Sequence, residues 1–127
     1  MPGHAFRAAV ERRDIDAAVA LLADDAVFRS PAVFGPYEGR AKVETILRTV
    51  FTIFEDFRYT DELTSEDGVH ALIFEARVGD RQVEGLDLIR PDADGKIGEF
   101  TVMLRPASGL MAVAEKMGAA LADAGVR

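Results

Sequence analysis

The stretch that decides the fold is residues 69–105, VHALIFEARVGDRQVEGLDLIRPDADGKIGEFTVMLR. Apolar residues alternate with polar ones along three runs, and the pairs Gly79-Asp80 and Asp94-Gly95 between the runs are typical of tight turns. Tight turns join only antiparallel neighbours, so the stretch predicts an antiparallel meander. Its three expected strands cover residues 69–78, 81–90 and 96–105.

Outside the meander, apolar residues recur at helical spacing in some segments and alternate as in strands in others. Stripes at helical spacing predict two short helices, one long helix and a C-terminal helix. The stripes are Phe6, Ala9 and Val10; Ala17, Ala18, Leu21 and Leu22; Val43, Ile46, Leu47, Val50 and Phe54; and Leu110, Val113, Met117 and Leu121. Alternation predicts a brief strand over residues 26–31, then a loop over 34–39, and a later strand in which Phe57, Tyr59 and Leu63 share one face. Helices followed by a run of hairpins favour a single α+β domain over residues 1–127.

Composition excludes several classes of function. The chain has 127 residues, 49% of them hydrophobic, which is enough for one domain with a real core. Its net charge of −7 argues against nucleic acid or an anionic membrane as a partner. With no cysteine and only two histidines, His4 and His70, we expect no disulfide, no metal site and no cofactor. The sequence shows neither a signal peptide nor a membrane span, so we expect a cytoplasmic protein.

Asp87 is the most informative residue of the strand expected over residues 81–90. It shares a face with Gly85 and Ile89, and counting back through the turn places it opposite Leu72. Among such neighbours the loss of water disfavours the carboxylate and raises its pKa, as a general acid or base near neutral pH requires. The alternative is a structural Asp87 tied to an arginine or a backbone amide.

The opposite face of the same strand is also partly apolar. Leu86 and Leu88 point there, with Thr101 and Met103 of the next strand beside them. If the helices cover the concave face, these residues lie on the convex face and need a cover of their own. A second subunit is the simplest cover, so we expect a homodimer through the convex sheet face.

Short motifs in a consistent order give the chain a family resemblance. They are the segments 14–16 and 21–26, Ser30-Pro31, Gly39-Arg40, Asp87 and the turn 94–97. In these the chain resembles, over nearly its whole length, the ketosteroid-isomerase and SnoaL-like superfamily, also called nuclear-transport-factor-two-like. The resemblance implies a cone-shaped, curved, mainly antiparallel sheet wrapped around helices and enclosing one apolar pocket. Because the motifs are short, the resemblance indicates fold better than reaction.

The roles that the family's isomerases give to three positions are only partly retained here. Their proton-shuttling aspartate, just before the proline that ends the first strand, corresponds to Ser30. Their oxyanion hole pairs a tyrosine of the first helix, here Phe6, with a protonated aspartate, here Asp87. Since only one of the three side chains, Asp87, is retained, the resemblance argues against steroid isomerisation. It is still compatible with the activity of SnoaL-like cyclases. Limonene-epoxide-hydrolase relatives use an Asp-Arg-Asp set, which Glu75 and Arg77 match only in part and on the face opposite Phe74.

Two classes of function stay open. In the first, the chain is a cofactor-independent isomerase, cyclase or hydrolase in which the catalytic Asp87 exchanges a proton with a small apolar ligand. In the second, the same fold is a silent ligand-binding or dimerisation module. Ser30 lacks a nucleophile elbow and is read as a pocket hydroxyl, and His70 is a candidate because it alternates onto the Leu72 face. The residues expected to line the pocket are Phe6, Phe28, Ser30, Val43, Leu47, His70, Phe74, Ala76, Phe100, Val102 and Leu104.

Overall fold

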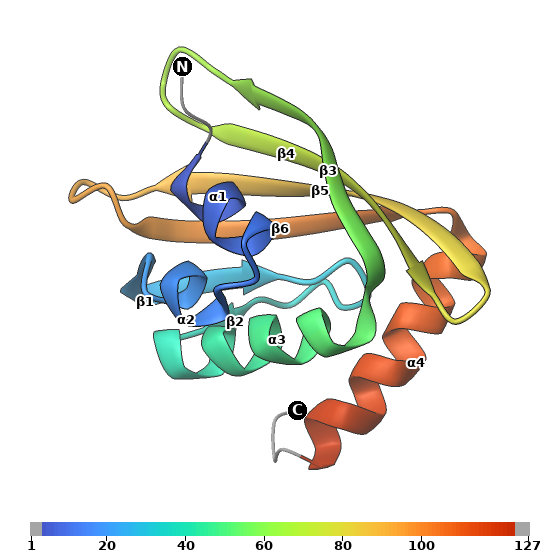
Figure 1. The fold of residues 1–127 in the computed structure, drawn as a ribbon. Coiled ribbons are helices and arrows are strands. Elements are labelled where there is room, and N and C mark those ends of the chain that lie inside the picture. The colour runs from blue at the N-terminus through green and yellow to red at the C-terminus, as the bar shows by residue number, and fades with distance from the viewer. Residues whose placement is uncertain (1–3, 124–127) are drawn as a thin grey trace.

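A computed structural model describes residues 4–123 of the chain (Figure 1). Six strands form one curved sheet in the order β2-β1-β6-β5-β4-β3, and four helices accompany it. The strands are β1 (Leu22–Arg29), β2 (Tyr37–Glu38), β3 (Glu55–Thr64), β4 (His70–Val78), β5 (Arg81–Pro91) and β6 (Ile97–Arg105). The α+β class and the antiparallel meander from β3 to β6 are confirmed. No helix in the described residues is long and apolar enough to cross a membrane.

The helices divide into two groups. They are α1 (Ala5–Glu11), α2 (Ile15–Val19), α3 (Arg40–Ile53) and α4 (Ala107–Asp123). The first three lie along one side of the sheet, whereas α4 leaves the far end of β6 and packs against α3, β5 and β6 (Figure 1). Asp14 caps α2 by accepting a hydrogen bond from the Ala17 backbone N–H, as expected of an aspartate ahead of a helix. The space between sheet, α3 and α4 is therefore closed by elements far apart in the sequence.

Two local expectations were wrong near the N-terminus. The second helix ends at Val19, and Leu22, expected on its stripe, opens strand β1 instead. The reason is tertiary, because β1 pairs in parallel with β6 and the Leu21 carbonyl accepts a hydrogen bond from the Ile97 N–H. Within the expected loop 34–39, the short strand β2 pairs with the end of β1.

Strand β3 does not keep the simple alternation that the sequence predicts. Its register against β4 shifts between Tyr59 and Asp61, which adds one residue to β3. After this bulge every side chain changes face. Leu63, expected beside Phe57 and Tyr59, is 56% exposed, and Glu62 pairs with the inward-facing Leu72 in its place. The bulge therefore brings a carboxylate to the concave side of the sheet.

Gly85 shapes the core under the middle of the sheet. A Cβ atom there would lie 2.2 Å from Cζ of Phe74 and 2.8 Å from Cδ2 of Leu104, so only glycine lets Phe74 lie against β5. Phe74 then stacks on Phe57 with ring centres 4.7 Å apart. This aromatic layer stops short of Asp87, two residues along β5, and leaves its carboxyl facing a space.

Candidate functional site

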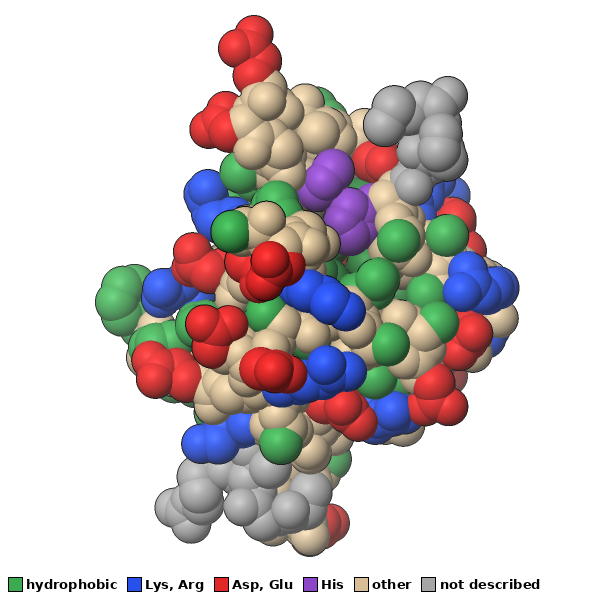
Figure 2. Space-filling model, turned by 90° about the vertical axis from the view of Figure 1, so that its left-hand side faces the viewer, with side chains coloured by type: hydrophobic (Ala, Val, Ile, Leu, Met, Phe, Trp, Pro, Cys, Tyr) green, Lys and Arg blue, Asp and Glu red, His purple; other side chains and the backbone are tan. Residues whose placement is uncertain are grey.

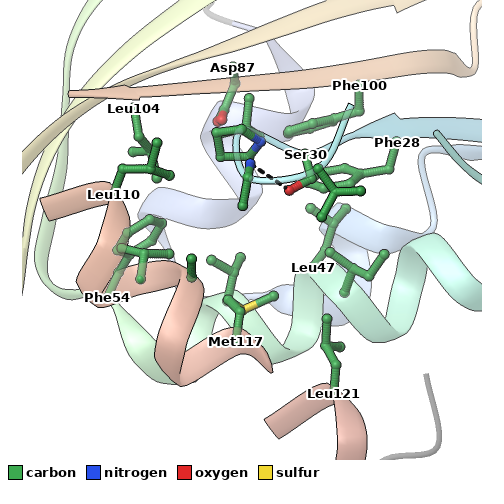
Figure 3. Close-up of a pocket in the computed structure, with 18 of the residues that line it drawn as sticks. Phe28, Ser30, Leu47, Phe54, Asp87, Phe100, Leu104, Leu110, Met117 and Leu121 are labelled. Atoms are coloured by element: carbon green, nitrogen blue, oxygen red, sulfur yellow. Dashed lines mark hydrogen bonds between the residues drawn. The ribbon is translucent and has the colours of Figure 1, made fainter. Parts of the chain in front are cut away.

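A cavity of about 150 Å³ lies between the concave side of the sheet, α3 and α4 (Figure 3). Its walls are almost entirely apolar, and the carboxyl of Asp87 points into it from β5. Eight of the residues expected at the pocket do line it: Phe28, Ser30, Leu47, Phe74, Asp87, Phe100, Val102 and Leu104. An apolar cavity of this size is enough for a molecule such as benzene, about 150 Å³ being the volume of a known benzene site.

The other expected lining residues lie elsewhere. Phe6, Val43 and Ala76 are buried in the core and do not line the cavity. Phe6 is separated from it because its ring packs edge-on against Phe100, with centres 5.0 Å apart. Alternation identified these side chains as inward-facing without distinguishing the packed part of the interior from the hollow part.

His70 is also outside the cavity. Its Nδ1 lies 3.0 Å from Oγ1 of Thr64, and its ring lies 4.3 Å, centre to centre, from that of His4. The two histidines touch at the molecular surface (Figure 2). In register His70 pairs with Ile89, one inward position beyond Asp87, so it shares the face that alternation predicts but not the site.

Much of the wall that the sequence did not assign to the site comes from α3 and α4. The helices and the C-cap residue Phe54 of α3 contribute Ile46, Val50, Phe51, Phe54, Leu110, Val113, Ala114, Met117, Gly118 and Leu121. Figure 3 shows Met117 and Leu110 facing the cavity from the side opposite the sheet. Both apolar stripes are visible in the sequence, but nothing in it says which surface each stripe covers.

Asp87 is 6% exposed, and its one hydrogen-bond partner in the described part of the chain is Tyr59, whose hydroxyl donates to Oδ2 at 3.2 Å. The expected pairing with Leu72 is present. No arginine or lysine among residues 4–123 forms an ion pair with this carboxyl, in contrast to the structural alternative. Burial therefore raises the pKa of Asp87 to about 7, and the Tyr59 hydrogen bond opposes the rise only in part.

The sequence does not indicate Tyr59 as a partner of Asp87, and this contact appears only in the fold. Its ring is held edge-on by Phe57 at 4.9 Å and by Phe74 at 6.4 Å, and the Arg7 guanidinium lies 5.7 Å from the ring centre. Burial first, and the nearby Asp87 second, raise the pKa of its hydroxyl well above the usual value, so it stays a donor. The alternation of β3 placed Tyr59 inward, but its reach to Asp87 crosses the intervening strand β4 and follows from the packing of the aromatic layer.

Comparison with known proteins agrees with the fold. A family profile described as a SnoaL-like domain matches residues 4–117. The chain belongs to this SnoaL-like family. It is similar to a steroid delta-isomerase from Pseudomonas aeruginosa, with 47% identity, 98% of this chain and 97% of that chain covered, and a TM-score of 0.87. No curated protein matches the sequence.

Two further solved structures are similar to this chain. One is an uncharacterised bacterial protein with a cystatin-like fold from Silicibacter pomeroyi, at 30% identity, 93% and 83% coverage, and a TM-score of 0.86. The other is the epoxide hydrolase/cyclase-like enzyme SalBIII, at 20% identity, 82% and 87% coverage, and a TM-score of 0.65, which indicates a shared fold alone.

The remaining polar candidates of this SnoaL-like chain have local partners. Ser30 lines the cavity, but its Oγ accepts a hydrogen bond from the Ala32 N–H at 3.0 Å and so closes a turn. Glu75 pairs with Arg58, and Arg77 pairs with Asp56, both away from the cavity. Within residues 4–123, no three His, Cys, Asp or Glu side chains are placed to hold a metal ion. Among the described residues, Asp87 is thus the one charged side chain at the cavity, and Tyr59, which does not line the cavity, holds it by a hydrogen bond from behind the wall.

Proposed function

We propose that this SnoaL-like chain binds a small, largely apolar molecule in the cavity and that Asp87 exchanges a proton with it. One observation carries the proposal: a buried carboxyl that has no cationic partner within residues 4–123 faces an apolar hollow of ligand size. Structural carboxylates are normally paired with a cation or with several N–H donors, so an unpaired one is a candidate for function.

The pKa of Asp87 suits acid and base work at neutral pH. With a value of about 7, both forms are populated there. The protonated form donates to an oxygen of the ligand, and the ionised form accepts a proton from it. Tyr59 holds the carboxyl in place by donating to Oδ2, which leaves Oδ1 to meet the ligand. The reaction class that fits is a cofactor-independent isomerisation, cyclisation or hydrolysis.

The relative named a steroid delta-isomerase makes proton transfer beside a carbonyl the first class to test. We expect steroid isomerisation itself to stay at background. Ser30 occupies the position of the isomerases' base, and a hydroxyl that accepts from Ala32 is a poor base. The cavity of about 150 Å³ is also smaller than the roughly 300–1,000 Å³ of sites for drug-sized ligands.

The experiment starts from ligands recovered from the purified protein by native mass spectrometry. Turnover of each ligand, and of a Δ5-3-ketosteroid, is then compared for wild type, Asp87→Asn and Glu62→Gln. We expect Asp87→Asn to lose about 10²–10⁴-fold in rate, the usual contribution of a general acid or base, with Glu62→Gln near wild type. Equal turnover by Asp87→Asn, or steroid turnover far above the buffer rate, would contradict the assignment.

One observation favours the alternative of a silent binding module. Asp87 is the single carboxyl among the described residues that line the cavity, so no second carboxyl is at hand there to share acid and base work. In that case Asp87→Asn would bind the recovered ligands as tightly as wild type, and mass spectrometry would find them unchanged after incubation with either protein.

We also propose that the chain forms a homodimer through the convex face. Ile73, Leu86 and Met103 are in register across three adjacent strands there, and Met103 is 51% exposed. Leu88 lies in the next row, between Ala71 and Thr101. Analytical ultracentrifugation at tens of micromolar should give a dimer that Leu88→Glu dissociates. A wild-type monomer would reject the proposal, and a dimer indifferent to Leu88→Glu would move the interface elsewhere.

A further inference from the structure

A second hollow, of about 360 Å³, lies on the other side of the aromatic layer from the cavity. It is formed where the turn between α1 and α2 meets the end of α3 and the start of β3. Its lining is Val10, Glu11, Arg13, Ile15, Phe51, Phe54, Phe57, Arg58 and Tyr59. We refer to it as the outer hollow and to the cavity at Asp87 as the inner cavity.

The wall between the two spaces is one side chain thick. Phe51, Phe54 and Phe57 line both the inner cavity and the outer hollow. The Phe57 ring centre lies 6.0 Å from that of Phe51 and 5.8 Å from that of Phe54, and all three side chains are only partly buried. A wall of three partly exposed side chains, with no backbone in it, is where a ligand could join the two spaces by displacing rings alone.

The pair proposed for function spans the same wall. Asp87 lines the inner cavity, Tyr59 lines the outer hollow, and their hydrogen bond of 3.2 Å joins the two sides. A molecule that lies across the wall therefore passes the reactive carboxyl.

Of the charged side chains that line the outer hollow, the one without a partner among residues 4–123 is positive. Glu11 pairs with Arg7 at 3.2 Å, and Arg58 pairs with Glu75. Arg13, which is exposed, has no ion-pair or hydrogen-bond partner for its guanidinium among residues 4–123. A free guanidinium is suited to a carboxylate, which it binds through two parallel N–H donors.

We propose that the inner cavity and the outer hollow are two halves of one binding site for an elongated molecule with an apolar body and a carboxylate at one end. The body displaces the Phe54 and Phe57 side chains and enters the inner cavity, and the carboxylate stays outside at Arg13. Together the two spaces reach the volume of ordinary small-molecule sites, which the inner cavity alone does not. This inference rests on the proposed function, because it takes the inner cavity at Asp87 as the site of an apolar ligand.

The test uses three probes in calorimetry: toluene, 6-phenylhexanoate and the uncharged 6-phenylhexan-1-ol. Toluene is small enough for the inner cavity alone. We expect 6-phenylhexanoate to bind about tenfold tighter than the alcohol, and Arg13→Gln to remove that difference while leaving the alcohol and toluene unaffected. Arg12→Gln is the matched control, since Arg12 is an exposed neighbour that pairs with Asp14 and lines neither space.

Methyl NMR shows whether one ligand occupies both halves. Saturation with 6-phenylhexanoate should shift the methyl signals of Ile15 in the outer hollow and of Leu104 in the inner cavity together. Shifts confined to Ile15, or an equal effect of Arg13→Gln and Arg12→Gln, would overturn the joined site even if toluene binds. If toluene and the longer probes all fail to perturb Leu104, the apolar site of the proposed function fails, and this inference falls with it.

Discussion

Two carboxyls face the concave side of the sheet in one row, and their surroundings differ. Glu62 on β3 and Asp87 on β5 are both in register with Leu72, which lies between them on β4. Glu62 accepts hydrogen bonds from the Arg7 guanidinium at 3.2 Å and from the His4 backbone N–H at 2.9 Å. Asp87 accepts one, from the neutral Tyr59 hydroxyl.

Glu62 links β3 to α1 through its hydrogen bonds, whereas Asp87 has no such structural role and is available for chemistry. Glu62 is an acceptor for the N-terminal end of α1 and keeps 19% of its side-chain surface in solvent. Asp87 is buried without compensation for its charge, so it holds its proton to about pH 7. A position on the same face and in the same row of the sheet is thus not enough to make a candidate site. What distinguishes the two carboxyls is whether a cation pairs with them.

The largest expected effect comes from removing the Asp87 charge. Because its pKa is raised in the fold from 3.8, its ionisation costs stability as pH rises from about 4 to about 7. The free energy of unfolding of Asp87→Asn, relative to wild type, should therefore shift in favour of the variant by up to about 4 kcal/mol between pH 4 and pH 8. Urea unfolding at several pH values measures this. A difference that does not change with pH would contradict a raised pKa of Asp87.

Removing the Glu62 charge should lower the free energy of unfolding at neutral pH, whereas removing the Asp87 charge should raise it. Glu62→Gln weakens the contacts with Arg7 and His4, and we expect a loss of about 1 kcal/mol at pH 7, the scale of a partly exposed charge-assisted pair. The loss should shrink at high salt. Glu66→Gln, at an exposed turn position, is the control, and equal unfolding midpoints for the two variants would remove the structural role of Glu62.

A stability effect of similar size is expected at Tyr59, the one hydrogen-bond partner of Asp87 within residues 4–123. Tyr59→Phe removes the hydrogen bond that lowers the pKa of this carboxyl, so the pKa should rise above about 7. Loss of one hydrogen bond should cost about 1 kcal/mol of stability. Carbon NMR of the Asp87 carboxyl follows the titration. Tyr37→Phe, which alters the tyrosine that does line the inner cavity, should leave the pKa of Asp87 unchanged, and the same shift in both variants would contradict the assignment.

The smallest effect is expected at Ser30. Its hydroxyl closes a turn with Ala32 and does not hydrogen bond to Asp87, so Ser30→Ala should change stability by no more than about 0.5 kcal/mol. The Asp87 pKa, followed by the same carbon NMR titration, should stay at its wild-type value. A clear displacement would show that Ser30 also interacts with Asp87.

Some features of this protein were determined by its sequence alone. Hairpin turns and period-two alternation are local properties of the chain, and they were sufficient to predict the meander, the inward face of Asp87 and its pairing with Leu72. The same local patterns predicted the class of the fold and much of the cavity lining.

Other features were decided only by the tertiary structure. The parallel pairing of β1 with β6, the bulge that turns Glu62 inward, the contact of Tyr59 with Asp87 and the placement of α4 over the cavity all join segments far apart in the chain. An apolar stripe records that a surface is buried but not what buries it, and the partner of a strand carboxyl is selected only by packing. Glu62 and Asp87 show this most directly: both are acids on strands, but within residues 4–123 a guanidinium reaches Glu62 and none reaches Asp87.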